Sequence, residues 1–381
     1  MFEKLKEYIT KSKTETQTNS QDSAKQVDKT QNPIYQLVQE ELKNYIAIRA
    51  TIEKEEKLLN GRPHQTKQKI EDKILELIET DESILEIQEE KTQFNIGMEA
   101  IVHNLDRVAM RALQNNTAST QQSSLLGHNM CMMALHQLKY DLLYEAIKNP
   151  EAIRQVDKGG RNIGMMCMDP SFINETELRK IALILLDDDV VATTVTKGGY
   201  NMGMLAAERK YQEVVMKALD NPVASTQRSN AYFNNIGMLC IENGLEDCAM
   251  KALKNPEASL QTDYKGRNMG NLAADNKMES VVIEALKNPE ASVQVDVWGF
   301  TIGMRAAANC LTDAMKIAYQ NPEAKLIHNK WGESIVTIAK DNDILDVLGE
   351  DAQDDLDETP SAIGTISYKD IMNYRDMENW R

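Results

Sequence analysis

The fold follows from one stretch of sequence, GRNMGNLAA at residues 266–274, because related stretches recur along most of the chain. Each copy has Asn, Thr or Ser at the place of Asn268, a position called the anchor below. Successive anchors are 33 or 34 residues apart, with a single interval of 39. A fixed period of this length is typical of solenoids, in which each unit buries its apolar face against its neighbours. The eight anchors are Asn95, Asn129, Asn162, Asn201, Asn235, Asn268, Thr301 and Ser334.

The composition of the 381-residue chain narrows its class of ligand. A formal net charge of −16 argues against a nucleic-acid backbone or an anionic membrane surface as the main ligand, because both would be repelled. No run of about 18 apolar residues occurs, so no transmembrane segment is expected. The amino-terminal MFEKLKEYITKSK lacks the apolar region of a Sec-type signal peptide, and the five cysteines fit a reducing compartment. We therefore expect a cytoplasmic location.

Each repeat has the same local pattern. The anchor side chain can accept hydrogen bonds from exposed N–H groups at a helix start, so a short helix is expected after it. After a polar break, apolar pairs such as Val214-Val215 predict a second helix with a wide apolar face. This helix ends at an Asn-Pro pair such as Asn221-Pro222, because proline cannot continue a helix. An extended stretch and an Asp-x-x-Gly turn then lead to the next anchor.

The segment KGGYNMGMLAAERKYQEVVMKALDNPVAS, residues 197–225, resembles an ankyrin repeat in its turn, in the Ala-Ala of its first helix and in the Val-Val-x-x-Leu of its second. The resemblance extends over about residues 82–349. The family's Thr-Pro-Leu-His motif is replaced here by Asn-Ile/Met-Gly-Met, and its Gly after the second helix by Pro. The expected fold is therefore all-α, an α-solenoid of about eight ankyrin-like repeats with a 33-residue period.

The flanking segments differ in composition from the repeats. Residues 1–31 begin with an amphipathic piece and continue as a polar tract, which predicts a short helix followed by disorder. The short helix is either an interfacial membrane contact or a fraying terminal helix. Residues 32–81 have helical patterns and are expected to form an amino-terminal cap on the first repeat. Residues 350–381 are predicted to be an acidic tail, with SYKDIMNYRDMENW as a possible capping helix.

Glycine and methionine recur at the start of the first helix of the repeats. Gly270 and its equivalents are unfavourable in a helix, so a packing reason is expected: glycine allows close helix approach, while the recurrent methionines fill the core. The alternative for the methionines is a soft-metal or peptide site. Cys131, Cys167, Cys240 and Cys248 are interpreted as small core residues, and no metal or cofactor is predicted.

Two repeats are irregular. The third has an insertion, DPSFINE at 169–175, between its helices, and the fifth has AYFN at 231–234 in place of the glycine turn. The five histidines are scattered, and no phosphate-binding loop, GxSxG elbow or HExxH motif occurs, so no catalytic residue is predicted. An enzyme with its site in the insertion or in the amino-terminal helices is the weakest hypothesis.

The chain concentrates its large aromatic residues in the turns just before the anchors, although aromatics make up only 5% of its residues. Ankyrin repeats are expected to vary these turns for partner binding, and Trp, Tyr and Arg are frequent binding hot spots. The alternative is that the aromatics shield one another along the row of turns. The predicted partner-binding residues are Tyr200, Tyr232, Phe233, Tyr264, Arg267, Trp298, Phe300, Lys330 and Trp331.

These observations favour a non-enzymatic scaffold that binds another protein through the concave loop face of repeats four to eight. The Arg and Lys residues at the turns predict an acidic or mixed-charge segment as the partner. The second hypothesis is a bacterial ankyrin-repeat effector, delivered into the cytosol of a host cell to redirect a host protein. The missing Sec signal is compatible with that hypothesis without demonstrating it.

Overall fold

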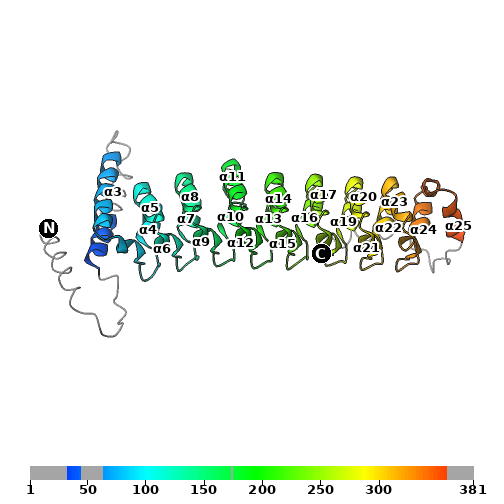
Figure 1. Ribbon diagram of the computed structural model, residues 1–381, viewed down its shortest axis with the longest axis horizontal. Coiled ribbons are helices and arrows are strands. Elements are labelled where there is room, and N and C mark those ends of the chain that lie inside the picture. Colours follow the sequence, from blue (N-terminus) through cyan, green and yellow to red (C-terminus); the bar gives the residue numbers. More distant parts are fainter. Residues whose placement is uncertain (1–31, 44–62, 173–174, 358–381) are drawn as a thin grey trace, which may run out of the picture.

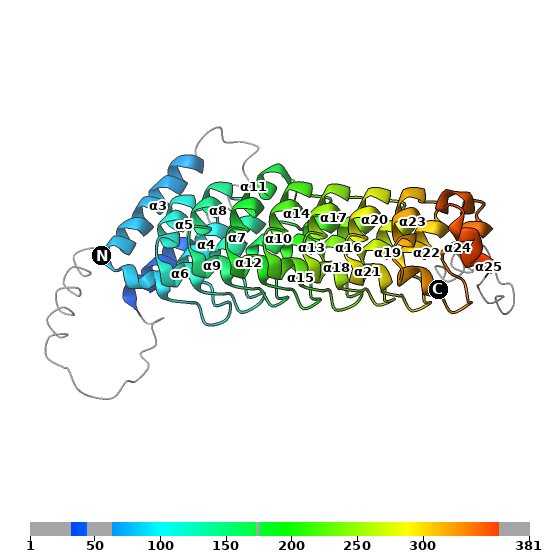
Figure 2. The ribbon, with the colours of Figure 1, turned by 45° about the vertical axis from the view of Figure 1, so that its right-hand side comes forward.

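The computed structural model describes residues 32–43, 63–172 and 175–357. These residues form helices stacked in chain order along one long axis, and no β-strand occurs within them (Figure 1). The row is close to straight in both ribbon views, so the loop face is a long edge without marked concavity (Figure 2). The predicted all-α solenoid of ankyrin-like repeats is confirmed. The predictions for residues 1–31 and for SYKDIMNYRDMENW lie outside the described residues.

Each repeat begins with an inner helix that starts directly after its anchor. The helix is short, and most of its residues are buried because it lies between the outer helix of its own repeat and the inner helices of adjacent repeats (Figure 2). The inner helices are α4 (Ile96–Val102), α7 (Met130–His136), α10 (Ile163–Met166), α13 (Met202–Glu208), α16 (Ile236–Glu242), α19 (Met269–Asp275), α22 (Ile302–Ala308) and α24 (Ile335–Asp341).

An outer helix packs against each inner helix, after a tight turn in every repeat except the third. The insertion of the third repeat shortens α10 to a single turn and gives that repeat the longest outer helix of the array, α11, which projects above its neighbours (Figure 1). The outer helices are α5 (Asp106–Leu113), α8 (Tyr140–Ala146), α11 (Glu175–Leu185), α14 (Gln212–Ala218), α17 (Glu246–Ala252), α20 (Glu279–Ala285) and α23 (Thr312–Tyr319), with η4 (Leu345–Leu348) following α24.

A third, one-turn helix follows the outer helix, where the sequence predicted only an extended stretch. That prediction was wrong for a local reason: the Asn-Pro pair starts a helix as well as ending one. Asn221 Oδ1 accepts from the N–H groups of Val223 and Ala224, and Pro222 occupies the first helical position, where its missing N–H costs nothing. The third helices are α6 (Asn116–Thr120), α9 (Pro150–Arg154), α12 (Asp189–Thr193), α15 (Pro222–Thr226), α18 (Pro256–Leu260), α21 (Pro289–Val293) and η3 (Ala324–Leu326).

The anchor holds the parts of a repeat together. Asn201 is fully buried, and its Oδ1 accepts from the N–H of Met204 at 2.9 Å, which caps α13. Its Nδ2 donates to the carbonyl of Ala224 in α15 and to Oε1 of Gln227, both at 2.8 Å. Gln227 in turn donates to the carbonyl of Thr193 in the preceding repeat. Asn201 thus links the first and third helices, and through Gln227 it is connected to the preceding repeat.

The recurrent glycines lie where adjacent helices touch, which confirms the packing explanation. A Cβ built on Gly203 would lie 2.7 Å from the Cβ of Ala218 in α14 and 2.6 Å from Cδ1 of Ile236 in the next repeat. These distances are below any normal contact, so only glycine fits without a shift. The methionines that follow these glycines, such as Met204 and Met238, are fully buried and therefore belong to the core rather than to a surface site.

The two ends of the array have their own helices. Residues 33–43 are helical, and α3 (Pro63–Thr80) packs against α5, with η2 (Glu82–Glu86) contacting both α3 and α4. The capping role of residues 32–81 stays a prediction. At the other end, the acidic stretch after Gly349 forms α25 (Asp351–Asp357), which packs on α24 and η4. Asp355 there accepts from the Tyr319 hydroxyl and pairs with Lys325 at 2.9 Å, which explains why this acidic segment is ordered.

Removing an anchor should destabilise the array strongly. We expect Asn201→Ala to lower the free energy of unfolding by about 2–4 kcal/mol, because the helix cap and two buried hydrogen bonds are lost together. Asn201→Ser keeps an acceptor for the cap, as Ser334 does in the last repeat, and should lose about half as much. Denaturant unfolding followed by circular dichroism measures both. Equal losses would contradict a contribution from the Asn201 amide nitrogen.

Filling a glycine position should also destabilise the array. Gly203→Ala should lower the free energy of unfolding by about 1–3 kcal/mol through overpacking against Ala218 and Ile236. The double variant Gly203→Ala/Ala218→Gly removes the rigid atom that the new methyl group meets, so it should be less unstable than the sum of its single changes. Additive losses in the same denaturant experiment would reject the close contact.

Candidate functional site

The loops that precede the anchors form a row along one edge of the array, called the loop row below (Figure 2). Backbone hydrogen bonds join each loop to the next: the N–H of Tyr264 donates to the carbonyl of Tyr232 at 3.1 Å, and that of Lys330 to the carbonyl of Trp298 at 3.0 Å. Within a regular loop, Asp263 Oδ1 accepts from the N–H groups of Lys265 and Arg267, each at 2.8 Å. The loop row is therefore a continuous, internally bonded surface.

The predicted binding residues differ in exposure along this row. Tyr232, Phe233 and Tyr264 have 54%, 45% and 51% of their surface exposed. Lys330 is exposed as well, whereas Tyr200, Trp298 and Trp331 are half-buried. The exposed aromatics therefore gather in the loops of repeats five and six rather than around the two tryptophans.

Phe300 and Arg267 do not lie at the surface as predicted. Phe300 is only 3% exposed and packs against Trp331, with their ring centroids 5.9 Å apart. The guanidinium of Arg267 is buried and pairs with Asp263 at 2.7 Å and with Asp275 at 3.2 Å. Both residues directly precede an anchor, and this position faces the inner helices. His128, Asn234 and Glu333 occupy the same position and are also buried, whereas Phe94, Arg161 and Tyr200 at this position are half-buried. The aligned repeats could have suggested this inward tendency.

The aromatic and cationic side chains of the sixth and seventh repeats already contact one another. Lys265 Nζ lies 5.3 Å from the ring centroid of Tyr264 and 5.9 Å from that of Trp298. The guanidinium of Arg305 lies 5.9 Å from the Trp298 ring. Because these contacts are intramolecular, the alternative interpretation of shielding aromatics describes the tryptophan end of the row well.

Two glutamates that the sequence analysis did not single out lie at the ends of adjacent inner helices. Glu208 is the last residue of α13 and Glu242 the last residue of α16. Both residues are exposed overall, but partial desolvation of the carboxyl groups raises the pKa of each. The charge of Arg209 lowers the pKa of Glu208. For Glu242, the hydrogen bond from Asn234 and the charge of Arg267 lower the pKa, and the charges of Asp263 and Glu208 raise it. Burial, and then the charge of Glu208, raise the pKa of the Tyr200 hydroxyl, with smaller contributions from Tyr232 and Glu242. These groups thus lie in one electrostatic neighbourhood. The signal in the sequence is an acidic residue seven positions after the anchor.

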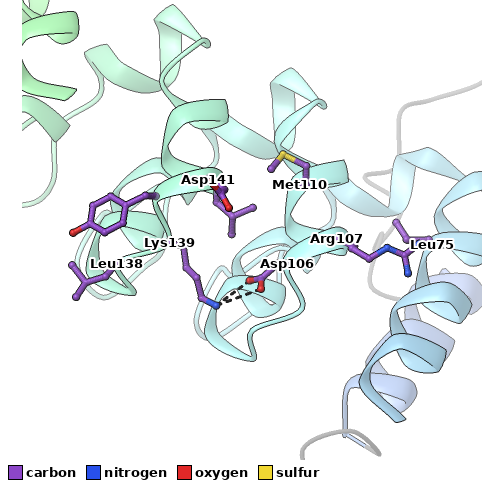
Figure 3. A pocket seen from close by; sticks show the side chains of 9 residues that line it. Leu75, Asp106, Arg107, Met110, Leu138, Lys139 and Asp141 are labelled. Carbon is purple, nitrogen blue, oxygen red and sulfur yellow. Dashed lines mark hydrogen bonds and ion pairs between the residues drawn. The ribbon is translucent and has the colours of Figure 1, made fainter. Parts of the chain in front are cut away.

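A separate hollow of about 730 Å³ lies at the inter-helix turns of the first two repeats, between α3, α5 and α8. Figure 3 shows Lys139 reaching the carboxylate of Asp106, with Nζ 3.1 Å from Oδ1. Lys67 also lies 3.5 Å from Asp106. No group of three or more His, Cys, Asp or Glu side chains suited to a metal ion occurs in the part of the chain that the structure describes. The Asp106 carboxylate of this hollow is already paired with two lysines.

No family model matches the chain, and no curated protein does. Among solved structures, the ankyrin repeat domain of Bcl-3, a member of the IkappaB protein family, is similar with 12% identical residues and a TM-score of 0.46. The match covers 58% of this chain and 97% of that one. The repeats themselves, with paired antiparallel helices and projecting loops, make the described part of the chain an α-solenoid of ankyrin-like repeats. None of the described helices is long and apolar enough to cross a membrane.

The raised pKa values of Glu208 and Glu242 should make the stability of the fold depend on pH. Their raised pKa means that the folded state holds protons which the unfolded state has already released, so each charged carboxylate destabilises the fold above its folded pKa. Glu208→Gln/Glu242→Gln should therefore unfold at a higher urea concentration than the wild type at pH 7. The difference should shrink as the pH falls towards the ordinary glutamate pKa. A difference that grows on acidification would contradict this assignment.

Proposed function

We propose that this chain is a non-enzymatic scaffold that binds a protein partner on the loop row of repeats four to eight. The observation that carries the proposal is the half-exposed aromatic group of Tyr232, Phe233 and Tyr264 in adjacent loops. Exposed aromatics gathered on one surface are typical of interaction sites, and Tyr is frequent among binding hot spots.

The rigidity of the loop row supports the same function. The hydrogen bonds between loops and the buried anchors beneath them hold the loop backbones that carry the exposed side chains. A preorganised surface loses less conformational entropy on binding, so more of the contact energy contributes to affinity. Trp298, Lys330 and Trp331 extend the surface towards the carboxyl-terminal end. Cytoplasmic location, and delivery into a host cell as an effector, stay predictions.

The exposed tyrosines provide the test. A partner is first captured from a cell lysate with the wild-type chain, identified and purified. Tyr232→Ala/Tyr264→Ala should then weaken its binding by about 2 kcal/mol or more, close to thirtyfold, measured by isothermal titration calorimetry. The unfolding midpoint should change little, because both side chains are half exposed.

A matched control removes exposed apolar side chains from another face. Val190→Ser/Val223→Ser changes two exposed valines in α12 and α15 and should leave the affinity unaltered. If the tyrosine variant binds the partner with unchanged affinity, the binding site lies elsewhere on the solenoid. Trp331→Ala should instead lower stability, because its ring covers Phe300.

A further inference from the structure

In several repeats the residue directly before the anchor contacts the residue seven positions after the anchor, and the two are called the flanking pair below. An ion pair or a hydrogen bond joins the flanking pair in three repeats: Arg161–Asp169 at 3.6 Å, Asn234–Glu242 at 3.0 Å and Arg267–Asp275 at 3.2 Å. The fold therefore brings these two positions together, and the side chains there decide whether they attract or repel each other.

In the second repeat both members of the flanking pair are histidines. The rings of His128 and His136 stack, with their centroids 4.7 Å apart and their planes inclined by 23°. Phe172, from the insertion of the third repeat, packs on His136 with the ring centroids 5.8 Å apart. His128 is only 6% exposed, whereas His136 is exposed to solvent. Three rings in a row thus connect the second repeat to the third.

The surroundings of the two rings favour their neutral form. Desolvation by partial burial lowers the pKa of both histidines and is the largest cause. The charge of His136 lowers the pKa of His128 further, and the charge of Arg161 lowers both pKa values. Asp157 raises both, and Asp169 raises that of His136. Because Asp157 and Asp169 pair with Arg161, at 2.9 and 3.6 Å, their charge is already partly compensated.

Helices α4 and α8 also pack against α7, which ends at His136. The titratable groups on these two helices and on the residue that ends α4 are Glu99, His103, Tyr140, Asp141, Tyr144 and Glu145. Glu99 lies 3.5 Å from His103, and Glu145 pairs with Lys148 at 2.6 Å. The strongest charges acting on the two stacked rings thus belong to the pair itself and to the third repeat.

Acid should therefore weaken this contact. Since the pKa of both rings is lowered, the folded state binds fewer protons than the unfolded state below the ordinary histidine pKa of about 6.5. The stability that the neutral pair contributes is complete above that pH and is lost as the pH falls through the folded pKa. Two protonated rings at this separation also repel each other. The Arg267–Asp275 pair of the sixth repeat, in contrast, stays attractive over the same pH range.

We infer that the His128–His136 stack is an acid-sensitive contact between the second and third repeats. At neutral pH the uncharged rings stack and support Phe172. When both rings are protonated they separate, and Phe172 loses its contact with α7. Histidine suits this role because its charge ordinarily changes between pH 5 and 8. Each repeat of a solenoid contacts only its neighbours, so the loosening is local to this junction.

Hydrogen–deuterium exchange followed by mass spectrometry tests the contact on the full chain. Exchange rates at pH 7.5 and pH 5.5 are corrected for the intrinsic pH dependence of amide exchange. We expect peptides that contain α7 and residues 163–172 to lose protection about tenfold at pH 5.5, because local opening becomes easier there. Peptides from the sixth and seventh repeats provide the internal reference and should keep their protection.

Matched variants show whether the two histidines cause the response. His128→Phe/His136→Val gives the second repeat the flanking pair of the first, Phe94 and Val102, which takes up no proton. The loss of protection at pH 5.5 should disappear in this variant, whatever its stability at pH 7.5. His136→Gln is a second variant that cannot develop two charges, and it should remove most of the response. His328→Gln removes an exposed histidine outside the pair and should respond like the wild type.

Two outcomes would overturn this inference. One is a wild type whose second and third repeats are equally protected at pH 7.5 and pH 5.5. The other is an equal loss of protection in the wild type and in both pair variants, because a different group would then be titrating. Neither outcome bears on the proposed partner site, which lies on the loops of repeats four to eight.

Discussion

The structure depends on one buried side chain in each repeat, the anchor that starts the inner helix. In six of the eight repeats it is an asparagine, which accepts at the helix start and donates to the third helix of its own repeat. A buried amide has to satisfy both its oxygen and its nitrogen, and here each has a partner. Because Gln227 and its equivalents pass the connection to the preceding repeat, the position of one loop fixes the next.

This constraint explains how an array of very short helices can present a defined surface. Helices of about seven residues have little stability in isolation, so their order comes from packing and from capped ends. The same caps place the loops at regular intervals, and hydrogen bonds between loops complete the row. Side chains that point out of this row, such as those of Tyr232 and Tyr264, stay half exposed, so the fold depends less on them than on the buried anchors.

Charge divides the loop row into two parts. In the sixth and seventh repeats, Asp263, Asp275 and Asp296 surround Arg267 and Arg305, so the charges there serve the structure. In the fourth and fifth repeats, Glu208 and Glu242 form no ion pair within the described residues. The most exposed aromatic side chains of the row, Tyr232, Phe233 and Tyr264, belong to repeats five and six. A repeat protein can thus keep one backbone and vary the role of each unit through a few side chains.

The sequence by itself determined the period, the helical class, the anchors and the packing role of the glycines, because each of these recurs at fixed spacing within a single repeat. The start of the third helix at the Asn-Pro pair is also encoded locally, because Asn caps the helix and Pro suits its first position. The sequence analysis took this pair only as a helix end. Only the tertiary structure decided that Phe300 and Arg267 face inward while Tyr232 and Tyr264 face outward. The reason is physical: burial and charge compensation depend on side chains one repeat away, such as Asp275 for Arg305, and a single sequence does not specify which of them meet.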